Sequence, residues 1–181
     1  MKGAVFIALN EMIEEQHGLG TWLDILDQTG LEGVFTSTET YPDEALFKIV
    51  AAVCETLKAP APDVLRAFGE YLFDFLHKAH PVFAESQSNF FDFISSIDGV
   101  IHVEIHKLDE NAQTPKIWVE RADESSATLS YQSPRKLCHL AEGLLKGAAR
   151  YYGISIAMEH GQCMHDGAPH CHLHLTQVTP E

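Results

Sequence analysis

The last quarter of the chain concentrates side chains that proteins use to bind metals. Three of the four cysteines lie there, and five of the eleven histidines fall within the final 22 residues. Cys138, His160, Cys163 and Cys171 offer three thiolates and one imidazole, a set that holds Zn²⁺ tetrahedrally in a closed structural site. In a reducing compartment such a cluster favours a metal over disulfides, so the sequence predicts Zn²⁺ bound by these residues.

Three further histidines follow the alternation of a β-strand near the C-terminus. Because successive side chains of a strand point to opposite faces, Cys171 is expected to share the inward face with Leu173 and Leu175. The other face then carries His170, His172 and His174. We interpret this histidine row as facing water, in preference to a second metal site.

Tyr131, Ser133 and Arg135 lie where a predicted strand leads into a predicted helix. In extended backbone these positions point the same way, which would bring two hydroxyls and one guanidinium together. Such a set is suited to carboxylates or phosphates. Taken alone, the segment is better explained by a strand end, a Ser-Pro turn and a solvated arginine than by an anion-binding site.

His102 stands in the apolar stretch VIHVEIHKL. A single histidine on such a face is more often a hydrogen-bonded core residue than a ligand. His106, four residues later, could form a metal-binding pair with it, but Glu104 is not adjacent to the first histidine, so the H-E-x-x-H pattern of zinc proteases is absent. His106 is expected to be solvated.

The first 110 residues must position these groups mainly with helices. Apolar spacing predicts helices over 4–17, around 22–26 with a stop at Gly30, and over 43–58, 64–80 and 89–108. Asp63 is expected to cap the fourth helix, and the fifth is expected to be interrupted near residues 98–99. Cys54, alone in the third helix, is interpreted as an ordinary core thiol.

In the second half of the chain, most apolar segments have the two-residue period of β-strands. Strands are predicted over 116–119, 127–133, 154–158 and 171–177, with a helix over 136–151 between the second and third. This β-β-α-β-β order favours a four-stranded antiparallel sheet with a helix packed on it. The fold class is therefore α+β, a single domain over residues 1–181 with a helical N-terminal subdomain.

Composition limits the possible partners. With 12 basic and 26 acidic residues the formal net charge is −14, which argues against nucleic acid or an anionic membrane as the main partner. The longest apolar stretches, 4–9 and 49–54, are too short to span a bilayer, and the start does not read as a signal peptide. We expect a cytoplasmic protein.

Several motifs taken together resemble one family. The opening MKG, His102 in an apolar helix, Pro115, Tyr131-x-Ser133-x-Arg135 and the thiol-rich C-terminus are similar to the heme-nitric oxide/oxygen binding (H-NOX) family, in particular its bacterial stand-alone members. The resemblance covers the whole chain. It implies heme b between a distal helical subdomain of about 1–65 and a proximal sheet subdomain of about 66–181.

The resemblance also implies roles for single residues. His102 would be the heme iron ligand, and Tyr131, Ser133 and Arg135 would bind the heme propionates. Pro115 would press on the porphyrin. Some related H-NOX proteins have zinc at the positions of the cysteine cluster, which supports that site.

The distal side of the implied heme pocket lacks a donor. Oxygen-binding relatives have a tyrosine where this chain has Leu140. Leu144, Val5 and Leu9 are expected to extend the apolar lining, although Leu140 could also be simply a core residue. Because bound O₂ gains from a hydrogen-bond donor and NO or CO needs one much less, such a pocket favours NO.

The expected function is a non-catalytic nitric oxide sensor that signals when NO releases His102 from the iron. Its output would pass to a partner, usually a histidine kinase in two-component regulation and less often a cyclic-di-GMP enzyme. One alternative is a zinc/thiolate redox-sensing adaptor. Another is an enzyme, a heme peroxidase or zinc hydrolase, against which stand the closed zinc set and a distal pocket without an acid–base pair.

Overall fold

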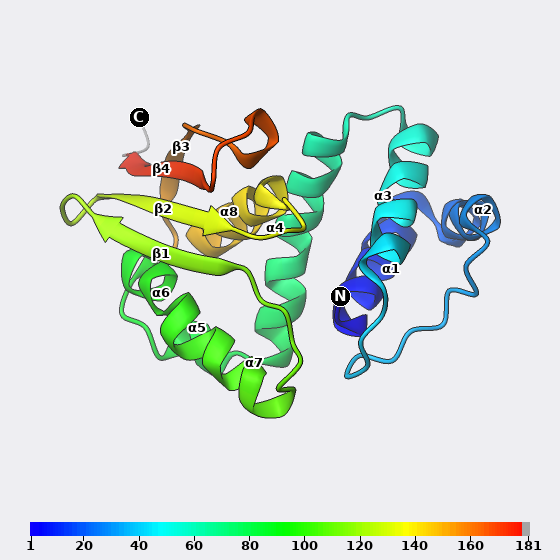
Figure 1. The fold of residues 1–181 in the computed structure, drawn as a ribbon, viewed down its shortest axis with the longest axis horizontal. Coiled ribbons are helices and arrows are strands. Elements are labelled where there is room, and N and C mark those ends of the chain that lie inside the picture. The colour runs from blue at the N-terminus through cyan, green and yellow to red at the C-terminus, as the bar shows by residue number, and fades with distance from the viewer. Residues whose placement is uncertain (179–181) are drawn as a thin grey trace.

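The computed structural model describes residues 1–178 and divides into a helical half and a half built around a sheet (Figure 1). The helices and strands, in chain order, are α1 (Gly3–His17), α2 (Leu19–Thr29), α3 (Asp43–Leu57), α4 (Ala61–Ala79), α5 (Val82–Glu85), α6 (Phe90–Ser96), the π-helix η1 (Ile97–His102), α7 (Val103–Leu108), β1 (Lys116–Arg121), β2 (Ser126–Gln132), α8 (Cys138–Tyr151), β3 (Ser155–His160), the 3₁₀ turn η2 (Met164–Asp166) and β4 (Cys171–Val178).

The helical half is formed by α1, α2 and α3 packed beside α4 (Figure 1). Each helix turns an apolar stripe inward, as its 3.6-residue spacing requires. The largest fully buried side chains of this core are Phe6, Leu9, Ile13, Ile25, Leu46, Ile49 and Phe68.

The other half is a four-stranded antiparallel sheet in the order β1-β2-β4-β3. In the register of the sheet Tyr131 of β2 lies between Ile117 of β1 and Cys171 of β4. Helix α8 packs on α4 and contacts β3, while α6 and η1 contact β1. The core of this half includes Phe90, Ile94, Leu129, Leu173 and Leu175.

Two glycines let α4 and α8 approach closely where the halves join. A Cβ atom on Gly69 would lie 2.3 Å from the carbonyl oxygen of Leu140, and one on Gly143 would lie 2.1 Å from that of Arg66. The two backbones are therefore in direct contact, which no residue with a side chain would permit without a shift.

The predicted α+β fold class, the sheet and its packed helix are confirmed. The cap predicted at Asp63 is wrong, because α4 begins two residues earlier at Ala61, with Pro62 in its first turn, where a fixed φ and a missing N–H are tolerated. Asp63 instead pairs with Arg66 at 2.9 Å. The helix α5 was not predicted, and the interruption expected near residues 98–99 is the π-helix η1.

The proposed division at about residue 65 falls inside the continuous helix α4 and stays a prediction. Within residues 1–178, none of the helices combines the length and the apolar character needed to cross a membrane.

Candidate functional site

His102 is the last residue of the π-helix η1, and one of its ring nitrogens forms a hydrogen bond with a carboxylate. Its Nδ1 lies 3.1 Å from Oδ1 of Asp98, four residues earlier, and only 9% of the residue is exposed. Asp98 Oδ1 also accepts a hydrogen bond from the N–H of Ile117 at 3.4 Å, which ties this segment to β1. Because a carboxylate accepts the Nδ1 proton, the lone pair of a neutral ring lies on Nε2.

Burial lowers the pKa of His102, and the carboxylate of Asp98 opposes that shift only in part. The ring is therefore neutral near pH 7. His106, by contrast, is exposed as predicted, and its Nε2 lies 3.0 Å from Oγ1 of Thr114.

Tyr131 and Ser133 bring two buried hydroxyls together at the end of β2. The N–H of Leu137 donates to Tyr131 Oη at 3.2 Å, and the N–H of Arg135 donates to Ser133 Oγ at 3.3 Å. Each oxygen thus accepts from backbone and keeps a proton to donate. Burial raises the pKa of Tyr131, so its phenol remains a donor.

The extended backbone assumed for this motif ends before Arg135. Strand β2 ends at Gln132, and the N–H of Lys136 donates to the carbonyl of Ser133 at 3.1 Å in a turn. The proline at 134 has no N–H to continue the ladder.

Arg135 links the two halves of the molecule. Its side chain is 10% exposed, and its Nε donates to Asp43 Oδ2 at 2.7 Å. Another guanidinium nitrogen donates to the carbonyl of Gln113. Asp43 Oδ1 in turn accepts from the Met1 amine at 2.8 Å. The alternative of a solvated arginine is therefore wrong.

The four predicted apolar lining residues all belong to the core of the helical half. Leu9 and Leu140 are buried, and Val5 and Leu144 pack against that core while half-buried. Leu144 also packs against the core of the sheet half. Pro115 is half-buried directly before β1, two residues from the Ile117 N–H that Asp98 binds.

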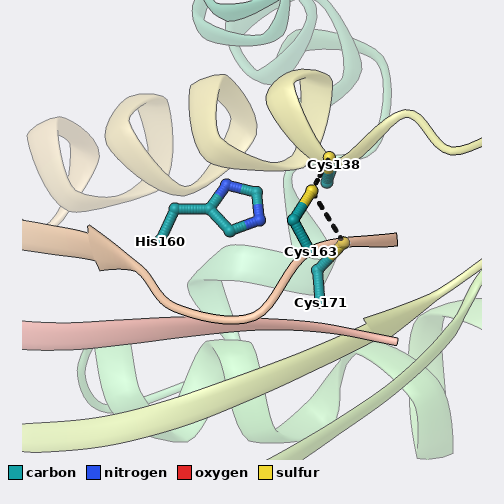
Figure 2. A group of neighbouring side chains, drawn as sticks. All are labelled: Cys138, His160, Cys163 and Cys171. Atoms are coloured by element: carbon teal, nitrogen blue, oxygen red, sulfur yellow. Dashed lines mark hydrogen bonds between the residues drawn. The ribbon is translucent and has the colours of Figure 1, made fainter. Parts of the chain in front are cut away.

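The predicted zinc ligands come together from four separate elements (Figure 2). Cys163 Sγ lies 3.9 Å from Cys138 Sγ and 3.8 Å from Cys171 Sγ, and all four ligand atoms, including one of His160, lie within 4.8 Å of one another. The three cysteines are not joined by disulfides. Cys138 begins α8, His160 ends β3, Cys163 precedes η2 and Cys171 begins β4.

Backbone N–H groups donate hydrogen bonds to two of these sulfur atoms, an environment that suits thiolates. The N–H groups of Met164 and His165 donate to Cys171 and Cys163 at 3.2 and 3.4 Å. Burial raises the pKa of Cys138 and of Cys171, so a nearby cation is needed before these thiols ionise together.

Glu142 completes this cluster and was missed in the sequence. Its carboxylate is 4% exposed, lies 2.5 Å from His160 Nδ1 and accepts from Arg66 Nε at 2.5 Å. Burial alone would raise its pKa, but the hydrogen bonds from Arg66, His139 and His160 lower it, so it is ionised. The remaining nitrogen, His160 Nε2, is buried without a hydrogen-bond partner in residues 1–178, and Figure 2 shows the ring beside the sulfur atoms.

The histidine row on β4 lies on the opposite face of the sheet, as predicted. Leu173 and Leu175 are buried, whereas His174 is exposed and His172 is half-buried. Cys54 packs against the helical core and is half-buried.

Comparison with known proteins gives a consistent result. Residues 2–160 match the family described as Haem-NO-binding. The structure is similar to the crystal structure of an H-NOX protein from S. oneidensis in the Fe(II)NO ligation state, with a TM-score of 0.93 and 36% identity, covering 99% of this chain and 100% of that one. It is also similar to an H-NOX from Shewanella woodyi, solved bound to IWP-051 in the Fe(II)CO ligation state, with a TM-score of 0.85, 33% identity and coverage of 98% and 95%.

A eukaryotic relative is more distant. Soluble guanylate cyclase 89Db of Drosophila melanogaster is 22% identical over 161 residues, which are 86% of this chain and 24% of that protein. The chain thus spans about a quarter of the length of that curated relative.

Proposed function

This chain belongs to the Haem-NO-binding family of heme gas-sensor domains, and from that premise we propose that it senses nitric oxide, with His102 as its heme iron ligand. The observation that carries the proposal is the pair His102–Asp98, in which Asp98 holds Nδ1 and leaves Nε2 for a metal. A histidine that binds a metal commonly donates its other ring N–H to a carboxylate in this way.

The donor set of the chain fits heme b. When bound, this group would supply a ferrous iron that His102 would hold and that can bind NO or CO. Tyr131 and Ser133 would donate their hydroxyl protons to the propionates, and Arg135 would add its charge. Pro115, next to β1, would contact the porphyrin.

Gas selection would follow from the distal side chains. Leu140, Leu144, Val5 and Leu9 are apolar residues of the helical core, and none offers a hydrogen-bond donor. Dioxygen on ferrous iron gains from a donor, whereas NO and CO need one much less. These residues therefore favour NO.

The switch would be the attachment of His102. Binding of His102 to iron would restrain η1, and Asp98, which contacts both His102 and the N–H of Ile117, would carry that restraint to β1. A signal that freed His102 would let this segment and the two halves move between two states. The chain would not be catalytic and would act in the cytoplasm on a partner, a histidine kinase or a cyclic-di-GMP enzyme.

One set of absorption spectra tests the sensor proposal. Reduced protein should have a heme Soret band that is unchanged in air-saturated buffer and that shifts on NO addition to the band of a five-coordinate nitrosyl. A long-lived oxygen complex would contradict the gas selection. Protein without a Soret band would favour the zinc/thiolate adaptor, which the family match does not support.

We propose a structural zinc site as well, favoured by the buried Nε2 of His160, which has no hydrogen-bond partner among residues 1–178 and lies beside three cysteines that are not in disulfides. Three sulfurs and one nitrogen close a tetrahedral Zn²⁺ site without an open position. Such a metal contributes directly to folding. Glu142 would orient His160 through Nδ1.

Metal analysis of protein prepared without chelators or oxidants tests this site. About one zinc per chain is expected. Cys171→Ser should lose zinc and stability, whereas Cys54→Ser, outside the cluster, should keep its zinc. Protein without zinc, or equal zinc in both variants, would contradict the proposal.

A further inference from the structure

The two histidines that flank Cys171, His170 and His172, share a hydrogen bond on the outer side of the sheet. Nε2 of one ring donates to Nε2 of the other over 2.8 Å, and the ring centroids are 4.7 Å apart. Nothing in the heme or zinc proposals uses these residues. From this contact we propose that His170 and His172 form a separate binding site for a divalent late transition metal ion, Cu²⁺ or Ni²⁺.

The distance between the two nitrogens favours a right angle at the metal. Metal–nitrogen bonds of about 2.0–2.1 Å place two ligands about 2.8–3.0 Å apart at a right angle and about 3.3–3.4 Å apart at a tetrahedral angle. The 2.8 Å of this hydrogen bond is also the ligand spacing of tetragonal coordination, which Cu²⁺ and Ni²⁺ prefer and structural Zn²⁺ does not. Such an ion could take the place of the shared proton while the two nitrogens keep about their present separation. Imidazole is a suitable ligand for both ions.

The surrounding strands hold the pair in place. His172 stands opposite Ser130, a small residue that leaves the ring room, and the His170 ring lies 5.1 Å from the indole of Trp118. The side-chain amide of Gln162 donates to the carbonyl of His170 at 3.3 Å and lies 3.5 Å from His172 Nε2. An amide at this position can offer a metal its oxygen by rotating about its last bond.

The charge of this face favours a cation. Glu120 and Glu159 lie on the same face of the sheet, because Glu120 pairs with Thr128, Thr128 with His174 and His174 with Glu159. The whole chain carries a formal charge of −14. Lys116 adds a positive charge on this face, with its Nζ 5.7 Å from the Trp118 ring centroid. The two carboxylates and the net negative charge of the chain still raise the local concentration of divalent cations.

The third histidine of the row provides a matched control. Nδ1 of His174 lies 2.9 Å from Thr128 Oγ1, and a Cβ atom on Gly161 would lie 3.0 Å from its Nε2. Its ring centroid is 6.0 Å from that of His172. His174 is thus engaged elsewhere and is not expected to bind the metal.

The test is a calorimetric Ni²⁺ titration of untagged protein whose cysteine cluster already holds zinc. Wild type should bind one Ni²⁺ per chain. His170→Gln and His172→Gln should each weaken binding at least about tenfold, as expected when one of two ligands is lost. His174→Gln should leave the affinity within about twofold.

Paramagnetic broadening by sub-stoichiometric Ni²⁺ locates the ion independently. In the diamagnetic Fe(II)CO state, signals of Trp118 and Ser130 on the outer face should broaden before those of Cys138 and Leu145 on the inner side. Unchanged affinity in His172→Gln, an equal loss in His174→Gln, or broadening centred on Cys138 would overturn the proposal.

Discussion

At the scale of single residues, two histidines of this chain share one arrangement. Asp98 faces Nδ1 of His102, and Glu142 faces Nδ1 of His160, so each ring has Nε2 left for a ligand. A carboxylate in this position fixes the tautomer and the orientation of the ring. The proposed heme and zinc sites therefore depend on residues that would touch neither metal.

Replacing His102 by glycine should remove the proposed iron ligand. His102→Gly is expected to bind heme poorly and to regain a ferrous Soret band when free imidazole occupies the vacated space. His106→Gly, an exposed control whose ring bonds Thr114, should behave as wild type. A normal five-coordinate ferrous spectrum in His102→Gly without imidazole would reject the assignment.

Leu140→Tyr tests the gas selection. Leu140 is 7% exposed in the helical core, where a phenol hydroxyl would supply the missing donor. The variant should form an oxygen complex that is measurable in air, because a hydrogen bond stabilises the partial charge on bound O₂. Leu65→Tyr, on the same half but not part of the proposed lining, is the control and should form none.

Residue types were enough to predict the proposed metal ligands, but not the carboxylates that contact the ligand histidines. The cysteines and His160 were predicted because soft ligands crowd one quarter of the chain. Asp98 and Glu142 were missed, although each lies four residues from a predicted ligand, Asp98 from His102 and Glu142 from Cys138. Acidic residues are common on solvated helix faces. Burial distinguishes Glu142 from them, whereas the Asp98 side chain is 48% exposed and is distinguished only by its contact with His102.

At the scale of elements, periodicity predicted most helices and all four strands. It did not predict that residues 97–102 form a π-helix, because the apolar pattern of VIHVEIHKL fits an α-helix equally well. The π-helix is a tertiary outcome in which Asp98 bonds both His102 and the backbone of β1. Such bulges are frequently found at functional sites.

The contact of α4 with α8 should be intolerant of added volume. In Gly143→Ala the new methyl group would lie 2.1 Å from the carbonyl oxygen of Arg66, so the helices must separate. We expect a loss of about 1–3 kcal/mol in the free energy of unfolding, the usual cost of overpacking, measured by urea denaturation.

Gly20→Ala is the matched control for this substitution. It lies in α2 with no atom within 4 Å of an added Cβ, so its stability should be unchanged or slightly higher. Equal destabilisation by both substitutions would mean that the α4–α8 contact is not the cause.

At the scale of the whole molecule, Asp43 joins the helical half to the sheet half through Arg135 and also binds the Met1 amine. Burial would raise the pKa of Asp43, but the hydrogen bonds from Met1 and Arg135 outweigh it and lower the pKa below the usual 3.8. A carboxylate with a lowered pKa stabilises the fold above its unfolded pKa, and this contribution disappears as the pH falls through its folded pKa.

Asp43→Asn should therefore lower the free energy of unfolding at neutral pH. Below about pH 4 the free energy of unfolding of the variant should fall less steeply with decreasing pH than that of wild type. Urea denaturation of wild type and variant between neutral and acidic pH measures both effects. Asp24→Asn changes an exposed carboxylate of α2 and should alter neither. An acid profile of Asp43→Asn that parallels wild type would show that this carboxylate does not join the halves.

The output of the proposed sensor must pass through a surface that changes when His102 is released. Val100, Val103 and Leu108 expose apolar side chains around His102, by 44%, 43% and 87%. A partner that docks there would distinguish the two states, and its difference in affinity limits the signal. The acidic chain favours a basic patch on the partner and a salt-sensitive encounter.

If the proposed partner is a histidine kinase, its autophosphorylation should respond differently to the ferrous and the NO-bound protein. Leu108→Lys should weaken the response about tenfold, because it places in the apolar docking surface a charge that repels a basic patch on the partner, while leaving the heme spectrum unchanged. Leu23→Lys, on an exposed site of α2 that is 54% accessible, should respond as wild type. If both ligation states and His102→Gly altered the kinase equally, the attachment of His102 would not control the output.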